Sequence, residues 1–401
     1  MANKRIYFAN QQVAIRGDEE GSENFETPDA LHGIQSIGMS TNFNLSQVFE
    51  LGQLPIYENI EDIPDVEVTM TKVLDGYPLI YHRATKDSTS TGPTLVNRSN
   101  SKCIFGLGIW PDTSDAAVGN ATSVVECSGM YPSSISYNFP VDDNFTEDVT
   151  LVGNNKIWAY QPAFYGTTHP VGPSVSGINP VMAGAFSLTS DDSPTGNNIV
   201  NRRPHLLFAY VTTSGVDVNG MVADPDATIL PPEVYGISLS GTNDETASVY
   251  GASIQRISVS VDLGREQINE LGRRGPYARI VTFPVEVTTE IEAISKSGDF
   301  VSATEDGTYT TGTDVCSNTA GNLQNNTIRI ATCDGTRIYC GSKNKLASVN
   351  YGGGDAGGGN ATNTYTYSSF NVMTVIHPND PHANGPTWAT NASKGAYLVS
   401  F

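Results

Sequence analysis

The sequence has few charged side chains, and most of those are acidic. Charged residues make up 16% of the 401 residues, and 22 Lys and Arg stand against 42 Asp and Glu, for a formal net charge of −20. A protein that grips nucleic-acid phosphates needs clustered Lys and Arg, because binding releases the counterions around the phosphates. The composition therefore argues against a phosphate-gripping protein, but it is compatible with a surface to which DNA does not stick.

Cysteine is also scarce. Five cysteines are too few, and too odd in number, for the disulfide scaffold of a chain this long. We therefore expect reduced thiols and assembly in a cytoplasm. The sequence lacks an apolar run long enough for a signal peptide or a membrane span, so we expect no membrane insertion.

Motifs that carry chemistry are missing as well. The sequence holds no nucleophile elbow, phosphate-binding loop, dinucleotide fingerprint or zinc-ligand spacing. The glycine-rich run 352–359 lacks the Gly-Lys-Ser/Thr end that a phosphate loop requires. Asp142, Asp143 and Asp355 could approach a calcium ion, but they offer too few carboxylates for its oxygen shell. We expect a protein that is not an enzyme, with no catalytic residues, no cofactor and no metal.

What the chain does contain is a duplicated unit. Residues 254–294 repeat residues 34–74, for most of their length at a constant offset of 220 residues. A second block repeats in the same order, with 133–155 matched by 348–375. Because two blocks recur in order, the duplication covers a domain and not merely a motif.

Each copy contains alternating segments. Apolar or β-branched residues recur at every second position over 37–43 and 257–263, which predicts a half-buried strand in each copy. After the shared proline the register slips by one residue, so that Val-Glu-Val-Thr at 66–69 aligns with the same run at 285–288. Alternation there predicts an antiparallel strand with one face toward a core and one toward water.

Between these strands, each copy is predicted to form a short helix. Residues 45–51 carry apolar side chains at helical spacing, with Asn44 before them and Gly52 after them as caps. Residues 267–271 are followed by Gly272 in the same way. Each segment is barely two turns long, so it can persist as a helix only by packing.

The rest of the chain divides around the two copies. The C-terminal run, 396–401, alternates in the manner of a segment that adds a strand to a neighbour's sheet. The predicted parts are a first domain with an N-terminal strand (1–157), a connecting segment or insertion (158–247), a second domain (248–376) and a C-terminal arm (377–401).

Together these blocks resemble phage tail tube proteins in which one chain carries two tube domains. The resemblance rests on Glu-Leu-Gly followed by a tyrosine at 50–57 and 270–277, and on the Val-Glu-Val-Thr runs. It also rests on 133–155 and its partner block, and altogether it covers about half of the chain.

The resemblance implies an all-β fold of two tandem β-sandwich tube domains, each with a short helix, which form a β-barrel tube on oligomerisation. Six such domains would close a ring, so three chains would form a pseudo-hexameric homotrimer. Stacked rings would be the conduit for DNA ejection in a virion tail, assembled in the bacterial cytoplasm. The implied partners are tape-measure, tail terminator and baseplate proteins, with DNA passing through transiently. The sequence leaves open whether a sheath is a further partner.

Two groups of residues are candidates for function. The acidic candidates for a lumen are Glu67, Glu286, Glu290 and Glu292. The candidates for ring-to-ring contact are Asp142, Asp143, Asp355, Tyr397 and Phe401. An ordinary wet sheet face would show the same glutamate pattern. Another virion protein, capsid-associated or in the baseplate, remains an alternative, as does a carbohydrate-binding or -cleaving β-protein that uses Trp110, Trp158 and Trp388.

Overall fold

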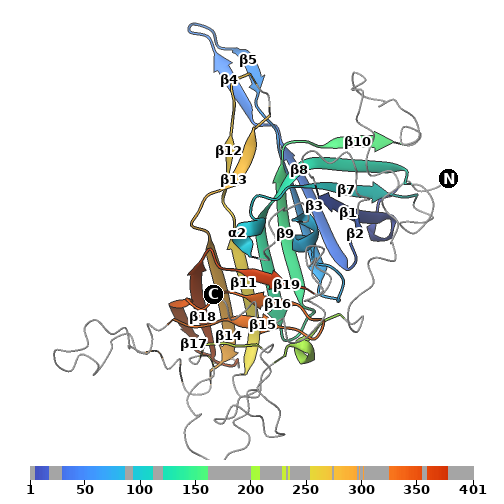
Figure 1. Cartoon of the computed structure of the whole chain (residues 1–401). Helices are drawn as coiled ribbons and strands as arrows, with labels where there is room; N and C mark the ends of the chain where they lie inside the picture. Colours follow the sequence, from blue (N-terminus) through green and yellow to red (C-terminus); the bar gives the residue numbers. More distant parts are fainter. Residues whose placement is uncertain are drawn as a thin grey trace, which may run out of the picture.

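The computed structural model shows an all-β protein (Figure 1). Its described α-helices, α1 (Ile80–Ala84) and α2 (Leu95–Arg98), have five and four residues. Within the described part of the chain, no helix has the length and hydropathy needed to cross a membrane. The structure describes residues 5–17, 29–85, 94–111, 121–160, 200–207, 228–231, 234, 253–272, 275–295, 298, 301, 325–354 and 359–377.

One antiparallel sheet, here the long sheet, contains strands from both copies. Its order is β3-β6-β9-β8-β11-β14-β18-β17, with β8 of the first copy paired to β11 of the second. The strands are β3 (Ile34–Asn42), β6 (Asp65–Val73), β9 (Thr146–Gly153), β8 (Ser123–Pro140), β11 (Ile254–Asp262), β14 (Glu286–Ile294), β18 (Thr362–Phe370) and β17 (Lys345–Gly352).

A second layer covers one face of the long sheet. Strand β8 is long enough to serve in both layers, because its N-terminal half pairs with β7 and β10, and β7 continues to β1 and β2. A separate three-stranded sheet, β15-β16-β19, belongs to the second copy. These strands are β7 (Cys103–Ile109), β10 (Ile157–Tyr160), β1 (Gln11–Gly17), β2 (Asp29–Ala30), β15 (Arg329–Ala331), β16 (Arg337–Tyr339) and β19 (Thr374–Ile376), with 3-10 turns η1 (Phe8–Asn10) and η4 (Arg203–His205).

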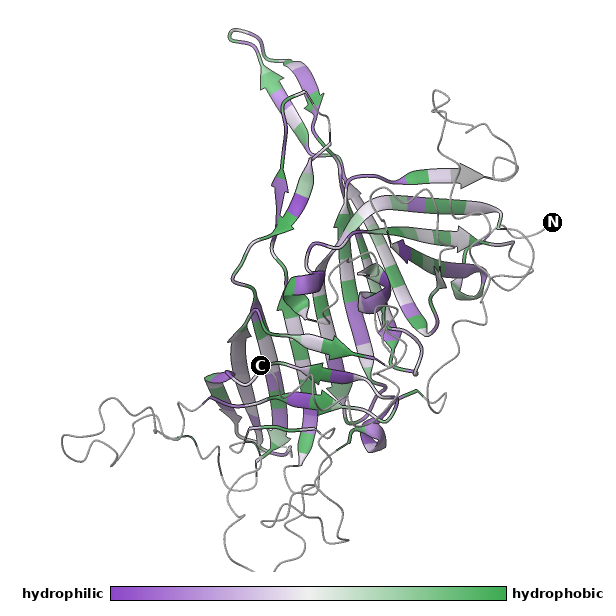
Figure 2. Cartoon of the chain, viewed as in Figure 1, coloured by the Kyte–Doolittle hydropathy of each residue, from purple (hydrophilic) through white to green (hydrophobic). Residues whose placement is uncertain are grey.

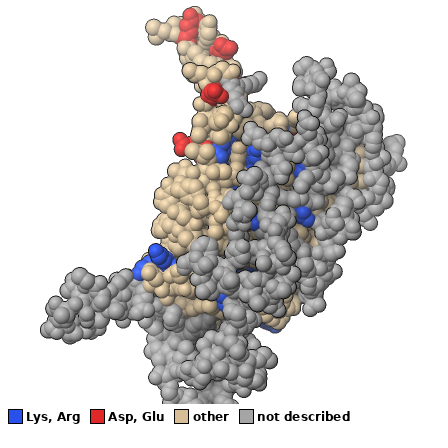
Figure 3. All heavy atoms as spheres, in the orientation of Figure 1, with Lys and Arg blue, Asp and Glu red and all other residues tan. Residues whose placement is uncertain are grey.

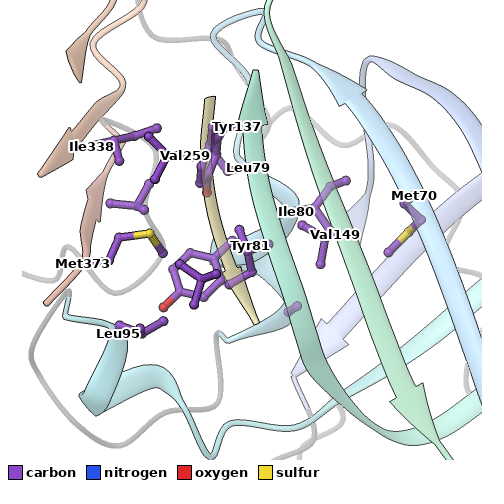
Figure 4. Packing of buried hydrophobic residues seen from close by; sticks show 14 of the residues in the cluster. Met70, Leu79, Ile80, Tyr81, Leu95, Tyr137, Val149, Val259, Ile338 and Met373 are labelled. Atoms are coloured by element: carbon purple, nitrogen blue, oxygen red, sulfur yellow. The ribbon is translucent and has the colours of Figure 1, made fainter. Parts of the chain in front are cut away.

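A single buried cluster joins the layers of both copies. It contains Met70 and Val149 from the first copy, Val259 from the second, and Tyr137 from β8 at the junction between them. Figure 4 shows these side chains with Tyr81, which α1 inserts into the core. Burying such side chains stabilises the fold by about 1.5–3 kcal/mol each. The two copies therefore share one continuous core.

The duplication recurs in the backbone. The order β3-β6-β9-β8 of the first copy is repeated as β11-β14-β18-β17, and both copies have bulges at matching places. The Gln35 side chain donates to the Gly33 carbonyl, just as Gln255 donates to the carbonyl of Ser253. Sequence repetition thus corresponds to a repeated structure.

The strand pairing corrects the alignment of the copies at their second strand. Val66 pairs with Thr41, and Val287 pairs with Val261, the match of Thr41 in the second copy. Val66 thus corresponds to Val287, two residues beyond its partner in the sequence alignment. A shift of two residues keeps every side chain on the same face, so alternation alone could not detect it.

The helices predicted at 45–52 and 267–272 are wrong, because both segments belong to β-hairpins. Strand β4 (Leu45–Phe49) pairs with β5 (Ile56–Glu61), and β12 (Arg265–Ile268) pairs with β13 (Ala278–Val281). Both hairpins project from the same end of the long sheet (Figure 1). All residues of β4 and β5 are exposed, so a two-turn helix would have no surface on which to bury its apolar side. Cross-strand hydrogen bonds satisfy the backbone there instead.

The described part of the connecting segment touches both copies. Asn201 donates its backbone N–H to the Leu74 carbonyl in the first copy, and the His205 carbonyl accepts from the Cys333 N–H in the second. The domain boundaries remain predictions from the sequence. Apart from His377, the C-terminal arm predicted at 377–401 lies outside the described residues.

Candidate functional site: the open face, free edges and hairpins of the long sheet

The long sheet has one face on the core and one face that the second layer does not cover, which we call the open face. In β6, Val66 and Val68 are buried while Glu67 and Thr69 are exposed, as expected for side chains that alternate between faces. Strand β14 alternates in the same way. Hydroxyl side chains recur across the open face, among them Ser40, Ser136, Thr150, Ser260 and Thr366.

All four glutamates selected from the sequence lie on the open face. Glu67, in β6, and Glu286 and Glu290, in β14, are exposed. Glu292 is half-buried and lies opposite Arg256 of β11. The fold brings these residues onto one surface.

The four glutamates are not the only charged residues of the open face in the described structure, since Asp148 and Arg256 also lie there. The Asp148 carboxylate accepts hydrogen bonds from Thr71, at 2.6 Å, and from Asn138, at 2.9 Å. Arg256 in turn donates to the Asn138 side-chain oxygen at 3.3 Å. Alternation over 146–153 was the available signal, because it places Asp148 among the polar positions of β9.

The long sheet ends at two unpaired edges in the described structure, β3 in the first copy and β17 in the second. These strands are equivalent to the two that pair at the centre of the sheet. The match of β3 is β11, and the match of the C-terminal half of β8 is β17. The free edges therefore carry the two halves of a junction that the chain already makes once.

Burial differs sharply between the junction and the free edges. Tyr137 of β8 is 0% exposed, whereas its match on β17, Tyr351, is 56% exposed. Val259 of β11 is also 0% exposed, while its match Met39 on β3 is only partly buried. The core-facing side chains at both edges thus lack the cover that their matches have.

The two hairpins end in exposed leucines. Leu51 and Leu271 occupy matching positions and are each 103% exposed. Each is followed by a glycine with positive φ, 88° at Gly52 and 83° at Gly272, which suits a tight turn. Apolar segments extend into β4 and β5 (Figure 2), and acidic side chains also lie on the projecting hairpins (Figure 3).

Of the five residues predicted to make ring-to-ring contact, two lie in the described part of the chain. Asp142 and Asp143 are exposed in the turn after β8, at the end of the sheet opposite the hairpins, since Pro140 pairs with Arg256 at the start of β11. The other three, Asp355, Tyr397 and Phe401, lie outside the described residues. The two ends of the long sheet thus differ in shape and composition.

The residues that a metal, sugar-binding or reactive-thiol site would need are not gathered together in the described structure. In the described ranges, no group of three or more His, Cys, Asp or Glu side chains could hold a metal ion. Of the tryptophans considered for sugar binding, Trp110 is buried and Trp158 is 39% exposed, while Trp388 lies outside the described residues. Cys103, Cys127 and Cys340 are buried, and burial raises the pKa of the Cys127 and Cys340 thiols to about 12.

Comparison with known proteins gives distant structural likenesses. No family model matches the chain, and no curated protein matches it. A chain of the anti-feeding prophage baseplate is 10% identical over 40% of this chain and 99% of its own length, with a TM-score of 0.30. A chain of the anti-feeding prophage cap is 11% identical over 40% of this chain and 94% of its own, with a TM-score of 0.28. A chain from an extracellular contractile injection system, in a sheath–tube complex, is 12% identical over 39% of this chain and 93% of its own, again with a TM-score of 0.28. TM-scores this low leave the function to be argued from the chain itself.

Proposed function

We propose that this protein is the subunit of a phage tail tube, in which copies join edge to edge into rings. The observation that carries the proposal is the match between the free edges and the β8–β11 junction. An exposed strand edge invites pairing with another strand, and here each edge already has its complement on the opposite side of the same molecule. Copies of the chain would therefore join through β17 of one and β3 of the next.

The junction inside the chain gives the register of this contact. Within the chain, Tyr137 pairs with Val259 and Ser136 with Ser260. The matching pairs between chains are Tyr351 with Met39 and Asn350 with Ser40. Pairing in this register would cover the exposed Tyr351 ring as its match Tyr137 is covered.

Three chains would close the ring. Each chain supplies two copies, and the resemblance to tail tube proteins implies six per ring. The copies differ, so the strict symmetry would be threefold and the sixfold symmetry only approximate. Closure would remove both free edges, which an open sheet leaves as a site of aggregation.

The open face would line the ring. The second layer lies on the other face of the long sheet and needs the larger outer circumference. The lumen would then carry Glu67, Asp148, Glu286, Glu290 and Glu292 against Arg256 and Lys345. A net acidic wall repels phosphates and lets DNA pass without adhering.

Rings would stack with the hairpin end of one against the turn end of the next. The apolar tips at Leu51 and Leu271 lie at one end, and the turn with Asp142 and Asp143 lies at the other. Such a head-to-tail contact uses two different surfaces, so it continues indefinitely as a filament.

Cysteine cross-linking tests the ring. In a Cys333→Ser background, which removes an exposed thiol, Ser40→Cys with Asn350→Cys should give a disulfide between neighbouring chains. Opposed residues in antiparallel strands have Cβ atoms about 4.5–5.5 Å apart, close enough for the bond with small adjustments. Non-reducing electrophoresis should show a ladder that ends at a covalent trimer.

The matched control is Ser136→Cys with Ser260→Cys, the equivalent pair inside the chain, which should give a disulfide but no ladder. Each single variant should give no ladder either. A ladder that ends at six chains would refute the trimer, and rings without any cross-link would refute the edge contact. Electron microscopy of the same sample shows whether rings and tubes are present.

A further inference from the structure

The β12–β13 hairpin does not stand free, because its base is bonded to the first copy. Arg265 donates to the Pro132 carbonyl at 2.6 Å and to the Ser99 carbonyl at 2.5 Å, and its guanidinium lies 4.9 Å from the centre of the Tyr131 ring. Burial lowers the pKa of this arginine to about 10. A hairpin of the second copy is thus bonded to the first copy at the end of the long sheet from which the hairpins project. We call this end of each copy its rim.

A second set of contacts converges on Asp65, at the start of β6 in the first copy. The Gln267 amide donates to its carboxylate at 2.9 Å, and Arg279 does so at 2.6 Å. Burial raises the pKa of Asp65, but hydrogen bonds from Asn44, Arg279 and Gln267 outweigh burial and hold the pKa below its usual value. The carboxylate is therefore a charged anchor for the hairpin.

The β4–β5 hairpin has the same pairing register, but no described residue supports it in this way. Gln47 pairs with Asn59 as Gln267 pairs with Arg279. Yet both strands of this hairpin are exposed throughout, and Leu45, the match of Arg265, is 63% exposed. In the described structure, the β4–β5 hairpin lies on no other copy of the domain.

At the rim of the second copy, the residues that match the internal binding surface are exposed or only partly buried. Its match for Asp65 is Glu286, because Val66 matches Val287 and each acidic residue comes directly before its valine. Beside Glu286 lies Phe370, which is 54% exposed and pairs with it across β14 and β18. The rim thus offers a carboxylate and, at Leu346, the match of Pro132, an apolar side chain, while the free hairpin offers an amide and a leucine.

We propose that the β4–β5 hairpin is a clasp that lies on the second-copy rim of the neighbouring chain in the same ring. Gln47 donates to the neighbour's Glu286, as Gln267 donates to Asp65 within the chain. Leu45 packs near the neighbour's Leu346, the match of Pro132, so this contact is apolar where the internal one uses Arg265. The proposal rests on the proposed ring and adds to it a second contact between the same two chains.

Two cysteine pairs, compared in the same Cys333→Ser background, test the clasp. Gln47→Cys with Glu286→Cys should be joined between neighbouring chains by a short bifunctional maleimide in isolated rings, separated from tubes by sedimentation. Gln267→Cys with Asp65→Cys, the internal equivalent, should be joined within one chain by the same reagent, since it spans the distance that the two hydrogen-bonded side chains now span. As a second measurement, Gln47→Ala should raise the concentration for half-maximal ring formation by about tenfold.

The outcomes separate the clasp from the ring. If Ser40→Cys with Asn350→Cys cross-links but the Gln47 pair does not, the ring stands and the clasp is refuted. Cross-linking of the Gln47 pair in tubes but not in single rings would place the hairpin on the next ring, which also refutes it. Failure of both pairs refutes the ring and the clasp together. The matched variant Gln53→Ala, at the hairpin tip, should leave ring formation unchanged.

Discussion

At the scale of single residues, the buried carboxyl of Glu147 connects β9 to the helix that fills the core. It accepts hydrogen bonds from the backbone N–H groups of Ile80, at 2.7 Å, and Tyr81, at 3.1 Å. Backbone N–H groups at the start of a helix have no acceptor within the helix, so the carboxyl supplies one. The Tyr137 hydroxyl donates to it at 3.0 Å. Burial raises the pKa of Glu147 to about 7, although these hydrogen bonds lower it in part.

This raised pKa predicts a stability that depends on pH. Since the folded-state pKa of about 7 exceeds the 4.5 of the free group, the folded chain holds this proton more tightly. The contribution of Glu147 to the free energy of unfolding should therefore fall as the pH rises from about 4.5 to 7, by about 3 kcal/mol. Glu147→Gln should lose this slope in denaturant unfolding of the unassembled chain. An equal slope in both proteins would show that Glu147 does not cause it.

At the scale of elements, the sequence predicted strands better than it predicted the segments between them. Alternation located the strands of both copies because one face of each packs on the core. Alternation could not distinguish a helix from a hairpin at 45–51. The spacing of the apolar residues there suits a helix, but in the described structure the segment has no protein surface against which a helix could pack. Nor could alternation locate the free edges or the clasp, since both depend on which strands are neighbours in space.

The hairpin tips make a prediction about stacking. Leu51→Asp with Leu271→Asp should leave the fold and the ring intact, because both side chains are 103% exposed. The charges should prevent the tips from burying apolar surface on the next ring, so electron microscopy should show rings without tubes. The control, Leu51→Met with Leu271→Met, keeps the apolar contact and should give tubes. Tubes of ordinary length from the aspartate variant would mean that stacking uses another surface.

At the scale of the whole molecule, the proposed assembly rests on the duplication more than on any single residue. The junction between β8 and β11 is an intact example of the contact proposed between chains, so register and partner strand follow without further assumption. The fold also shows where part of the acidic excess of the sequence lies. Glu67 and Glu290 fall on the open face, away from the shared core.

If the open face lines the tube, its residues should be reachable only through the narrow lumen. In a Cys333→Ser background, Glu290→Cys in assembled tubes should react with a small maleimide. A maleimide on a bulky polymer should react more slowly, by about tenfold or more, because a closed barrel excludes the larger probe from its interior. Val96→Cys, on α2 in the outer layer and 46% exposed, should react with both reagents at similar rates. Unassembled chains provide the reference, because there both positions are open to solvent. Equal labelling of Glu290→Cys by both reagents in tubes would place the open face outside and remove the acidic lumen from the proposal.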